Sequence, residues 1–145
     1  VPRPSKFDDA NNGEVSSAVD EAGDLLSNNE IDRALKRILK LSAHMNQYFQ
    51  ARAPWANKET ADATLYASVN ATRSLAILLE PFIPFSCKKM WSQLNLQGSV
   101  HQQRWESAKD MKAVPPDHPL GKIEPIFRKI EAKEIEQWKN KLGKP

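Results

Sequence analysis

Apolar residues in this chain recur mostly every three or four positions, the spacing of one buried face of an α-helix. Two such stripes near the start predict a short helix over 14–27 and a longer one over 30–52. Pro54 ends the second helix, because the residue before a proline is pushed out of the α-helical conformation. The first stripe consists of Val15, Ala18, Val19, Ala22, Leu25 and Leu26, and the second of Ile31, Ala34, Leu35, Ile38, Leu39, Met45, Tyr48 and Phe49.

The same spacing predicts three further helices. They cover 58–79, 87–94 and 132–142, and Pro81 and Pro84 separate the first two of them. Residues 95–120 have no periodic pattern and hold three prolines, which is typical of a loop or linker. The apolar positions of these three helices are Leu65, Val69, Leu75, Ala76, Leu78 and Leu79, then Met90, Trp91 and Leu94, and finally Ile135, Trp138 and Leu142.

Successive helices joined by short breaks predict an all-α fold, an antiparallel α-helical bundle with a C-terminal helix after a long loop. Alternating strand patterns are absent, and Leu, Ala, Lys, Glu and Gln favour helix. We expect residues 1–94 to form the bundle core and 95–120 to be a linker. Residues 121–145 form a C-terminal segment with its own helix, which packs back on the bundle or toward a domain outside this chain.

Length and composition indicate one soluble domain of 145 residues, 40% of them hydrophobic. Cys87 is the only cysteine, which excludes an internal disulfide and makes a reducing, cytoplasmic setting the default. The most apolar stretch, 75–85, is too short for a membrane span and is interrupted by Glu80. The missing initiator methionine and the opening VPRPSKF indicate a fragment of a longer protein without a signal peptide.

The net charge is only +3, but it is unevenly distributed. Residues 1–30 hold seven acidic and two basic side chains, whereas residues 31–58 hold six basic side chains and one acidic. A basic strip therefore runs along the second predicted helix. It is either a solvated helix face or a surface for a polyanion, and charge alone leaves both open.

Motifs for catalysis are missing. There is no G-x-x-x-x-G-K-[ST] or G-x-G-x-x-G loop to hold phosphates, and His44, His101 and His118 lack metal-ligand spacing. A buried, unreactive thiol is the ordinary interpretation of Cys87. We therefore expect no catalytic residue, metal or cofactor in this chain.

One group of residues lies around the exit of the basic helix: Asn46, Tyr48, Arg52, Pro54, Trp55 and Lys58. Unpaired bases stack on aromatic side chains while cations contact the phosphates, so this group suits single-stranded RNA. A tryptophan fixed by the preceding proline would be a rigid stacking surface. The alternative is that Trp55 covers the end of the bundle core, and the pattern alone does not decide between the two.

These residues also resemble a known family. Asn46, Tyr48, Ala53, Pro54 and Trp55 resemble the helix exit in the anticodon-binding domain of methionyl-tRNA synthetases, which are class I enzymes. Further similarity lies in LLEPFIPFSCKKMWSQL (78–94) and HPLGKIEPIFRKIEAKEIEQW (118–138). The resemblance covers about residues 14–142 and points to synthetases of archaeal or eukaryotic type.

The resemblance implies that Trp55 stacks on an anticodon base of tRNA(Met) and that Pro54 fixes it. Asn46 and Tyr48 would shape the pocket, and the basic strip would meet the phosphates of the anticodon stem, with the acidic first helix placed elsewhere. The candidates for phosphate contact are Arg33, Lys36, Arg37 and Lys40. The partner would be the anticodon stem-loop of tRNA(Met).

The resemblance also implies what lies outside this chain. The family's other anticodon readers, an Asn and an Arg four residues apart, are expected on a helix upstream of Val1. The catalytic domain, with ATP, magnesium and zinc as a further candidate, is expected elsewhere in the parent ligase, so this chain alone should be inactive. Residues 122–142 resemble a segment that folds back toward that domain. The remaining alternatives are the corresponding domain of another class I synthetase and a helical protein-interaction or scaffold domain.

Overall fold

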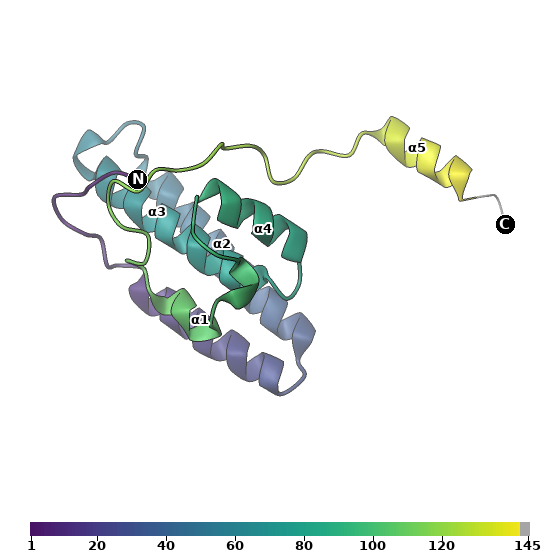
Figure 1. The fold of residues 1–145 in the computed structure, drawn as a ribbon, viewed down its shortest axis with the longest axis horizontal. Coiled ribbons are helices and arrows are strands. Elements are labelled where there is room, and N and C mark those ends of the chain that lie inside the picture. Colours follow the sequence, from purple (N-terminus) through teal and green to yellow (C-terminus); the bar gives the residue numbers. More distant parts are fainter. Residues whose placement is uncertain (143–145) are drawn as a thin grey trace.

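The computed structural model describes residues 1–142, and within them all regular structure is helical. The predicted all-α bundle is therefore confirmed, and each helix begins and ends within a few residues of its predicted bounds (Figure 1). The α-helices are α1 (Asn12–Ser27), α2 (Ile31–Arg52), α3 (Lys58–Leu79), α4 (Pro84–Gln93) and α5 (Ala132–Lys141). No helix in this described part is long and apolar enough to cross a membrane.

α1 and α2 form an antiparallel pair. Contacts from Glu14 to Arg37 and from Asn11 to His44 show that the start of α1 lies toward the end of α2. The stripe of α1 is buried as predicted at Val15, Ala18, Val19 and Ala22. The stripe of α2 was predicted less accurately: Ile31 and Leu39 are exposed, whereas Leu41 is buried.

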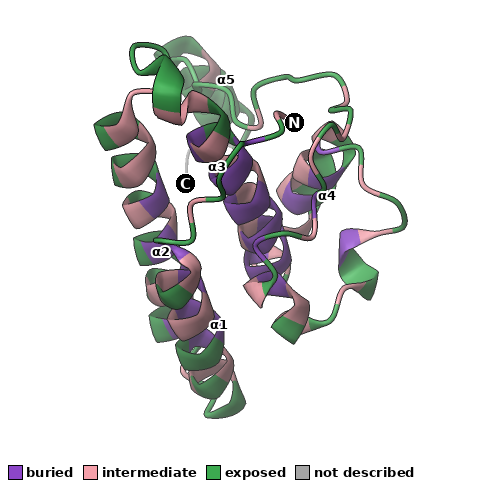
Figure 2. Ribbon diagram, turned by 90° about the vertical axis from the view of Figure 1, so that its left-hand side faces the viewer, coloured by how far each residue is buried: buried purple, intermediate pink, exposed green. Residues whose placement is uncertain are grey.

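α3 is the central helix, and half of its 22 residues are buried (Figure 2). It packs against α2 and α4 and against the 3-10 helices η1 (Val100–Gln102) and η2 (Trp105–Lys109). Because it has neighbours on several sides, α3 buries polar residues that need internal partners. The Arg73 guanidinium donates to the Ser107 carbonyl at 2.8 Å, and the Ser74 hydroxyl donates to the Ala108 carbonyl at 2.6 Å.

Residues 95–120 contain the two short 3-10 helices and no α-helix, and they pack into the core. Val100, Ala108, Met111 and Val114 are all at most 6% exposed. The Asn70 side chain accepts from the Val114 N–H at 2.8 Å and donates to its carbonyl at 3.3 Å. This segment therefore completes the bundle where α1 and α3 would otherwise be open to water.

The C-terminal segment leaves the bundle past α4 and ends in α5, which extends away from the other helices (Figure 1). Leu120, Ile123 and Phe127 line an apolar groove of about 470 Å³ together with α3 and α4. Among the described residues α5 packs against no other helix, and both Ile135 and Trp138 are exposed. Residues 143–145 of the predicted C-terminal segment lie outside the described residues.

Candidate nucleic-acid interface

The exit of α2 is a tight turn that sets the position of Trp55. Ala53 adopts a left-handed conformation with φ of 43°, and its carbonyl accepts the N–H groups of Ala56 and Asn57 at 2.8 and 2.9 Å. Pro54, in the middle of this turn, has a fixed φ and so stiffens the backbone just before Trp55. Trp55 is therefore attached to a well-defined turn and not to a frayed helix end, so its backbone position is fixed.

Trp55 is 63% exposed, so it does not lie in the bundle core. Its aromatic contact is with Phe49, one turn before the end of α2, at 5.7 Å between ring centroids and 56° between planes. This tilted packing supports the indole from the side of the helix, and most of the indole surface remains open to solvent. A planar ligand could therefore be received on Trp55 without displacing a core residue.

Tyr48 and Arg52 lie on another side of the same helix end, where both contact Asp8. Oδ2 of Asp8 accepts the Tyr48 hydroxyl at 2.9 Å and Nη2 of Arg52 at 2.7 Å. The Arg52 guanidinium also lies 5.6 Å from the centroid of the Tyr48 ring. Burial raises the pKa of Asp8, but hydrogen bonds from Ala10 and Tyr48 and the charge of Arg52 outweigh it and hold the pKa below its ordinary value. Asp8 is therefore the ionised centre of this cluster.

The two remaining predicted residues, Asn46 and Lys58, are exposed. Asn46 lines a small cavity of about 190 Å³ between α2 and α3, beside Phe49 and Thr72. Lys58 is the first residue of α3, and within residues 1–142 it forms no ion pair. The structure thus gathers Tyr48, Arg52, Pro54, Trp55 and Lys58 at one corner, with Asn46 on the adjoining groove.

Most basic side chains of the predicted strip, in the first half of α2, already form ion pairs with acidic residues of this chain. Arg33 pairs with Glu30 and Lys36 with Asp32, both on the solvent side. Within the described residues Lys40 has no ion pair. The distance from this region to Trp55 is considerable, since fifteen residues of α-helix separate Arg37 from Arg52, roughly 22 Å.

Arg37 differs from the other basic residues in the strip. Only 10% of its side chain is exposed, and it donates to Glu21 at 2.7 Å and to Glu14 at 3.0 Å. Burial lowers the pKa of Arg37, but the hydrogen bond to Glu21 and the two carboxylate charges raise it overall. The prediction that the acidic first helix lies apart from the basic strip is therefore wrong: α1 packs on α2, and its carboxylates neutralise Arg37.

Sequence reasoning missed two residues that matter at this corner, Asp8 and Phe49. Phe49 appeared only as one member of the buried stripe of α2, although its position six residues before Trp55 makes it the neighbour of that side chain. Asp8 lies in an extended segment 44 residues from Arg52, and no local pattern signals that contact.

Taken together, the chain is an all-α bundle domain that displays one exposed indole and two cations at a single corner. Comparison with known proteins is more specific. A family described as the anticodon binding domain of methionyl tRNA ligase matches residues 2–144, and the chain belongs to this family.

Curated relatives agree with this family. A methionine–tRNA ligase of Sulfolobus acidocaldarius is 38% identical over 121 residues, which are 81% of this chain and 21% of the relative. The corresponding ligase of Thermococcus kodakarensis is 35% identical over 126 residues, 84% of this chain and 16% of the relative. That of Thermococcus onnurineus is 32% identical over 142 residues, 93% of this chain and 18% of the relative. The chain thus spans about a fifth of the length of these relatives.

Proposed function

We propose that this chain is the anticodon recognition module of a methionine–tRNA ligase and that Trp55 stacks on an anticodon base of tRNA(Met). The observation that carries this proposal is the exposed indole of Trp55, supported by Phe49 and fixed by the turn at Ala53 and Pro54. Stacking of one base on an aromatic side chain contributes roughly 1–3 kcal/mol. A preformed stacking surface loses little conformational freedom on binding, so most of that free energy is retained.

Cations at the same corner would bind the phosphates around the stacked base. Arg52 and Lys58 are assigned this role because they flank Trp55 in the chain, Arg52 with a partly exposed side chain and Lys58 with an exposed one. Arg33, Lys36 and Lys40 lie nearer the start of α2, farther from Trp55, and are candidates for contact with the phosphates of the anticodon stem. Arg37 is not included, because its guanidinium already serves two carboxylates.

The proposal extends to the parent protein. Its relatives are methionine–tRNA ligases several times longer than this chain, so ATP-dependent aminoacylation would belong to residues outside it. The exposed apolar side chains of the C-terminal segment, Phe127, Trp138 and Leu142, favour a contact between this segment and the catalytic domain of the parent. This chain alone would bind tRNA without charging it.

The test is a fluorescence titration of this chain with a synthetic tRNA(Met) anticodon stem-loop at low salt. Binding should quench tryptophan fluorescence, and a stem-loop with an altered CAU anticodon should bind more weakly. Trp55→Ala should remove both the quenching and most of the affinity. Trp138→Ala is the matched control, because it removes an indole that is 46% exposed on α5 and far from the corner.

Three results would contradict the proposal. If the stem-loop does not bind, or if Trp55→Ala lowers the melting temperature without changing affinity, Trp55 is a structural residue and the domain serves protein interaction. If binding is retained but the anticodon sequence has no effect, the module recognises another RNA.

A further inference from the structure

The N-terminal segment, residues 1–11, is fixed to the bundle along its length. The Asp117 N–H donates to the Val1 carbonyl at 2.8 Å, and Nε of Arg3 donates to the Asp117 carboxylate at 2.8 Å. In the middle, the Phe7 ring packs on the Tyr66 ring with 5.0 Å between centroids. Asp8 therefore reaches the end of α2 from a segment that is held before it by Phe7 and after it by the hydrogen bond between Asn11 and His44.

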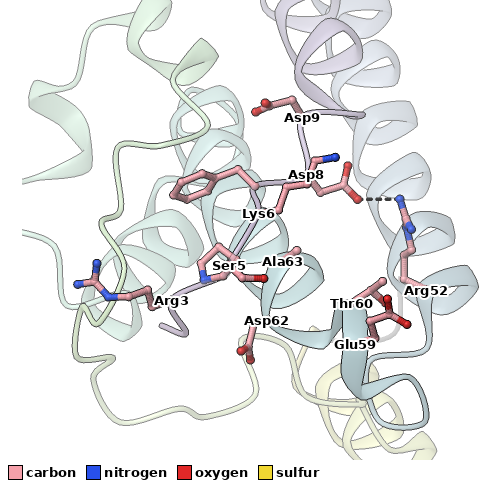
Figure 3. A pocket seen from close by; sticks show the side chains of 12 residues that line it. Arg3, Ser5, Lys6, Asp8, Asp9, Arg52, Glu59, Thr60, Asp62 and Ala63 are labelled. Atoms are coloured by element: carbon pink, nitrogen blue, oxygen red, sulfur yellow. Dashed lines mark hydrogen bonds and ion pairs between the residues drawn. The ribbon is translucent and has the colours of Figure 1, made fainter.

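Asp8 makes several contacts at once, and all of them are to this corner or to its own turn. Its Oδ1 accepts the Ala10 N–H at 3.0 Å, while Oδ2 accepts from both Tyr48 and Arg52. Only 16% of the Asp8 side chain is exposed, against 40% for Arg52. Figure 3 shows the ion pair at one edge of a pocket of about 700 Å³ between the N-terminal segment and the first turn of α3.

Arg52 uses one of its donor nitrogens in this arrangement. Nη2 is bonded to Asp8, and within residues 1–142 the other guanidinium donors, on Nε and Nη1, have no acceptor. The guanidinium carbon also lies over the Tyr48 ring, 5.6 Å from its centroid, which restricts the side chain further. An arginine held in this way is oriented but still offers N–H groups to a second acceptor.

We propose that Asp8 is a positioning residue of the RNA site: it holds Arg52 and Tyr48 so that the remaining donors of Arg52 face a phosphate of the nucleotide strand stacked at Trp55. The inference rests on the proposed function. Asp8 touches no RNA itself and acts through Arg52. Its effect comes from fixing a flexible side chain before binding, which reduces the conformational freedom lost on binding.

Electrostatics and positioning make opposite predictions for this residue. A carboxylate near a phosphate repels it, so removing the Asp8 charge should tighten binding if charge alone matters. If Asp8 positions Arg52, removing it should weaken binding even though the site becomes more positive. The sign of the change therefore separates the two effects.

The experiment compares Asp8→Asn with Asp9→Asn in the stem-loop titration. Asp9 is the adjacent carboxylate and pairs with Lys112 at 3.3 Å, away from Arg52, so its variant matches the change in net charge. We expect Asp8→Asn to weaken binding about 3- to 10-fold and to lower the dependence of affinity on salt, because a phosphate contact is lost. Asp9→Asn should bind as tightly as the parent chain or slightly more tightly.

A double-mutant cycle links the effect to Arg52. Arg52→Ala should weaken binding by a similar factor, and the Asp8→Asn, Arg52→Ala double variant should be no weaker than Arg52→Ala alone. A purely structural role would lower the melting temperature and leave affinity and salt dependence unchanged in the folded variant. Circular dichroism at the titration temperature establishes that each variant is folded.

Trp55→Ala separates failure of this inference from failure of the proposed function. If Trp55→Ala weakens binding but Asp8→Asn leaves it unchanged or tighter, Asp8 is not a positioning residue and the RNA site stands. If Trp55→Ala has no effect on binding, both the proposed site and the role of Asp8 are overturned.

Discussion

The two ends of α2 use arginine in opposite ways. Near its start, Arg37 is 10% exposed and is held by Glu14 and Glu21 of α1. At its end, Arg52 is 40% exposed and is held by the single carboxylate of Asp8. Both are basic residues of one helix paired with acidic residues from the first 21 positions of the chain.

The difference lies in how many donors and how much surface each arginine keeps. Arg37 donates from its Nε and both of its Nη atoms, to Glu14, Ser17 and Glu21, so little of it is available to a ligand. Arg52 is bonded on one nitrogen and is the last residue of α2, three positions before the exposed indole of Trp55. We call the part of α2 around Arg37 the closed end and the part around Arg52 the open end. A basic side chain therefore stabilises the fold at the closed end and is available for binding at the open end.

The largest effect is expected at the open end, from Trp55→Ala. Loss of one stacking interaction of roughly 1–3 kcal/mol should weaken stem-loop binding about 5- to 150-fold. The free energy of unfolding should change by much less, because Trp55 is 63% exposed. Parallel titration and urea unfolding of the same variant measure both quantities. A large loss of stability with unchanged affinity would show that Trp55 stabilises the fold and does not bind the RNA.

Next in size is Arg37→Ala at the closed end, which should act on stability alone. Removing hydrogen bonds to charged groups costs about 1–3 kcal/mol, and the carboxylates of Glu14 and Glu21 would be left facing each other across the gap. Urea unfolding measures this loss. Stem-loop affinity should stay within about twofold of the parent chain, and a marked fall in the affinity of the folded variant would show that Arg37 contacts RNA.

A smaller effect is expected from the pH dependence of the Asp8 contacts. Because the folded-state pKa of Asp8 lies below its ordinary value, these contacts stabilise the fold above about pH 4 and are lost as the pH falls through the folded-state pKa. The stability difference between the parent chain and Asp8→Asn, about 1 kcal/mol at neutral pH, should therefore shrink below pH 4. Urea unfolding between pH 3 and pH 7 measures it, and a difference that stays constant to pH 3 would exclude Asp8 as the source.

The smallest effect on stability is expected from Arg33→Ala and Lys36→Ala. Their ion pairs with Glu30 and Asp32 are exposed, and such pairs contribute about 0–1 kcal/mol. Melting temperatures measured at low and high salt should be nearly the same as for the parent chain. A fall in affinity at low salt would assign these two residues to the phosphates of the stem; unchanged affinity would limit the interface to the open end.

Local pattern was enough for most of the fold. The predicted helix over 58–79 coincides with α3, because a periodic stripe and flanking prolines act within a few residues. Residues 95–120 were expected to be a loop, and nothing in their pattern indicated that Val100, Ala108, Met111 and Val114 are buried. Their burial depends on contacts with α1 and α3, which are distant in sequence.

The candidate site was predictable in part. The sequence identified Pro54 and Trp55 as the end of a helix but left open whether the indole lay in the core. The exposed fraction of Trp55 and its contact with Phe49 answer that question, since both depend on how the turn at Ala53 directs the side chain. That Trp55 stacks on a base stays a prediction.

The helices, the turn after α2 and the family could be predicted from the sequence, because they depend on spacing and on short motifs. Which basic residues are already paired depends on how the segments pack in three dimensions. Arg37 and Arg52 differ because antiparallel packing of α1 on α2 brings two carboxylates to the first, while the extended N-terminal segment brings one to the second. Such pairings join residues 16 to 44 positions apart, and no local pattern in the chain encodes them.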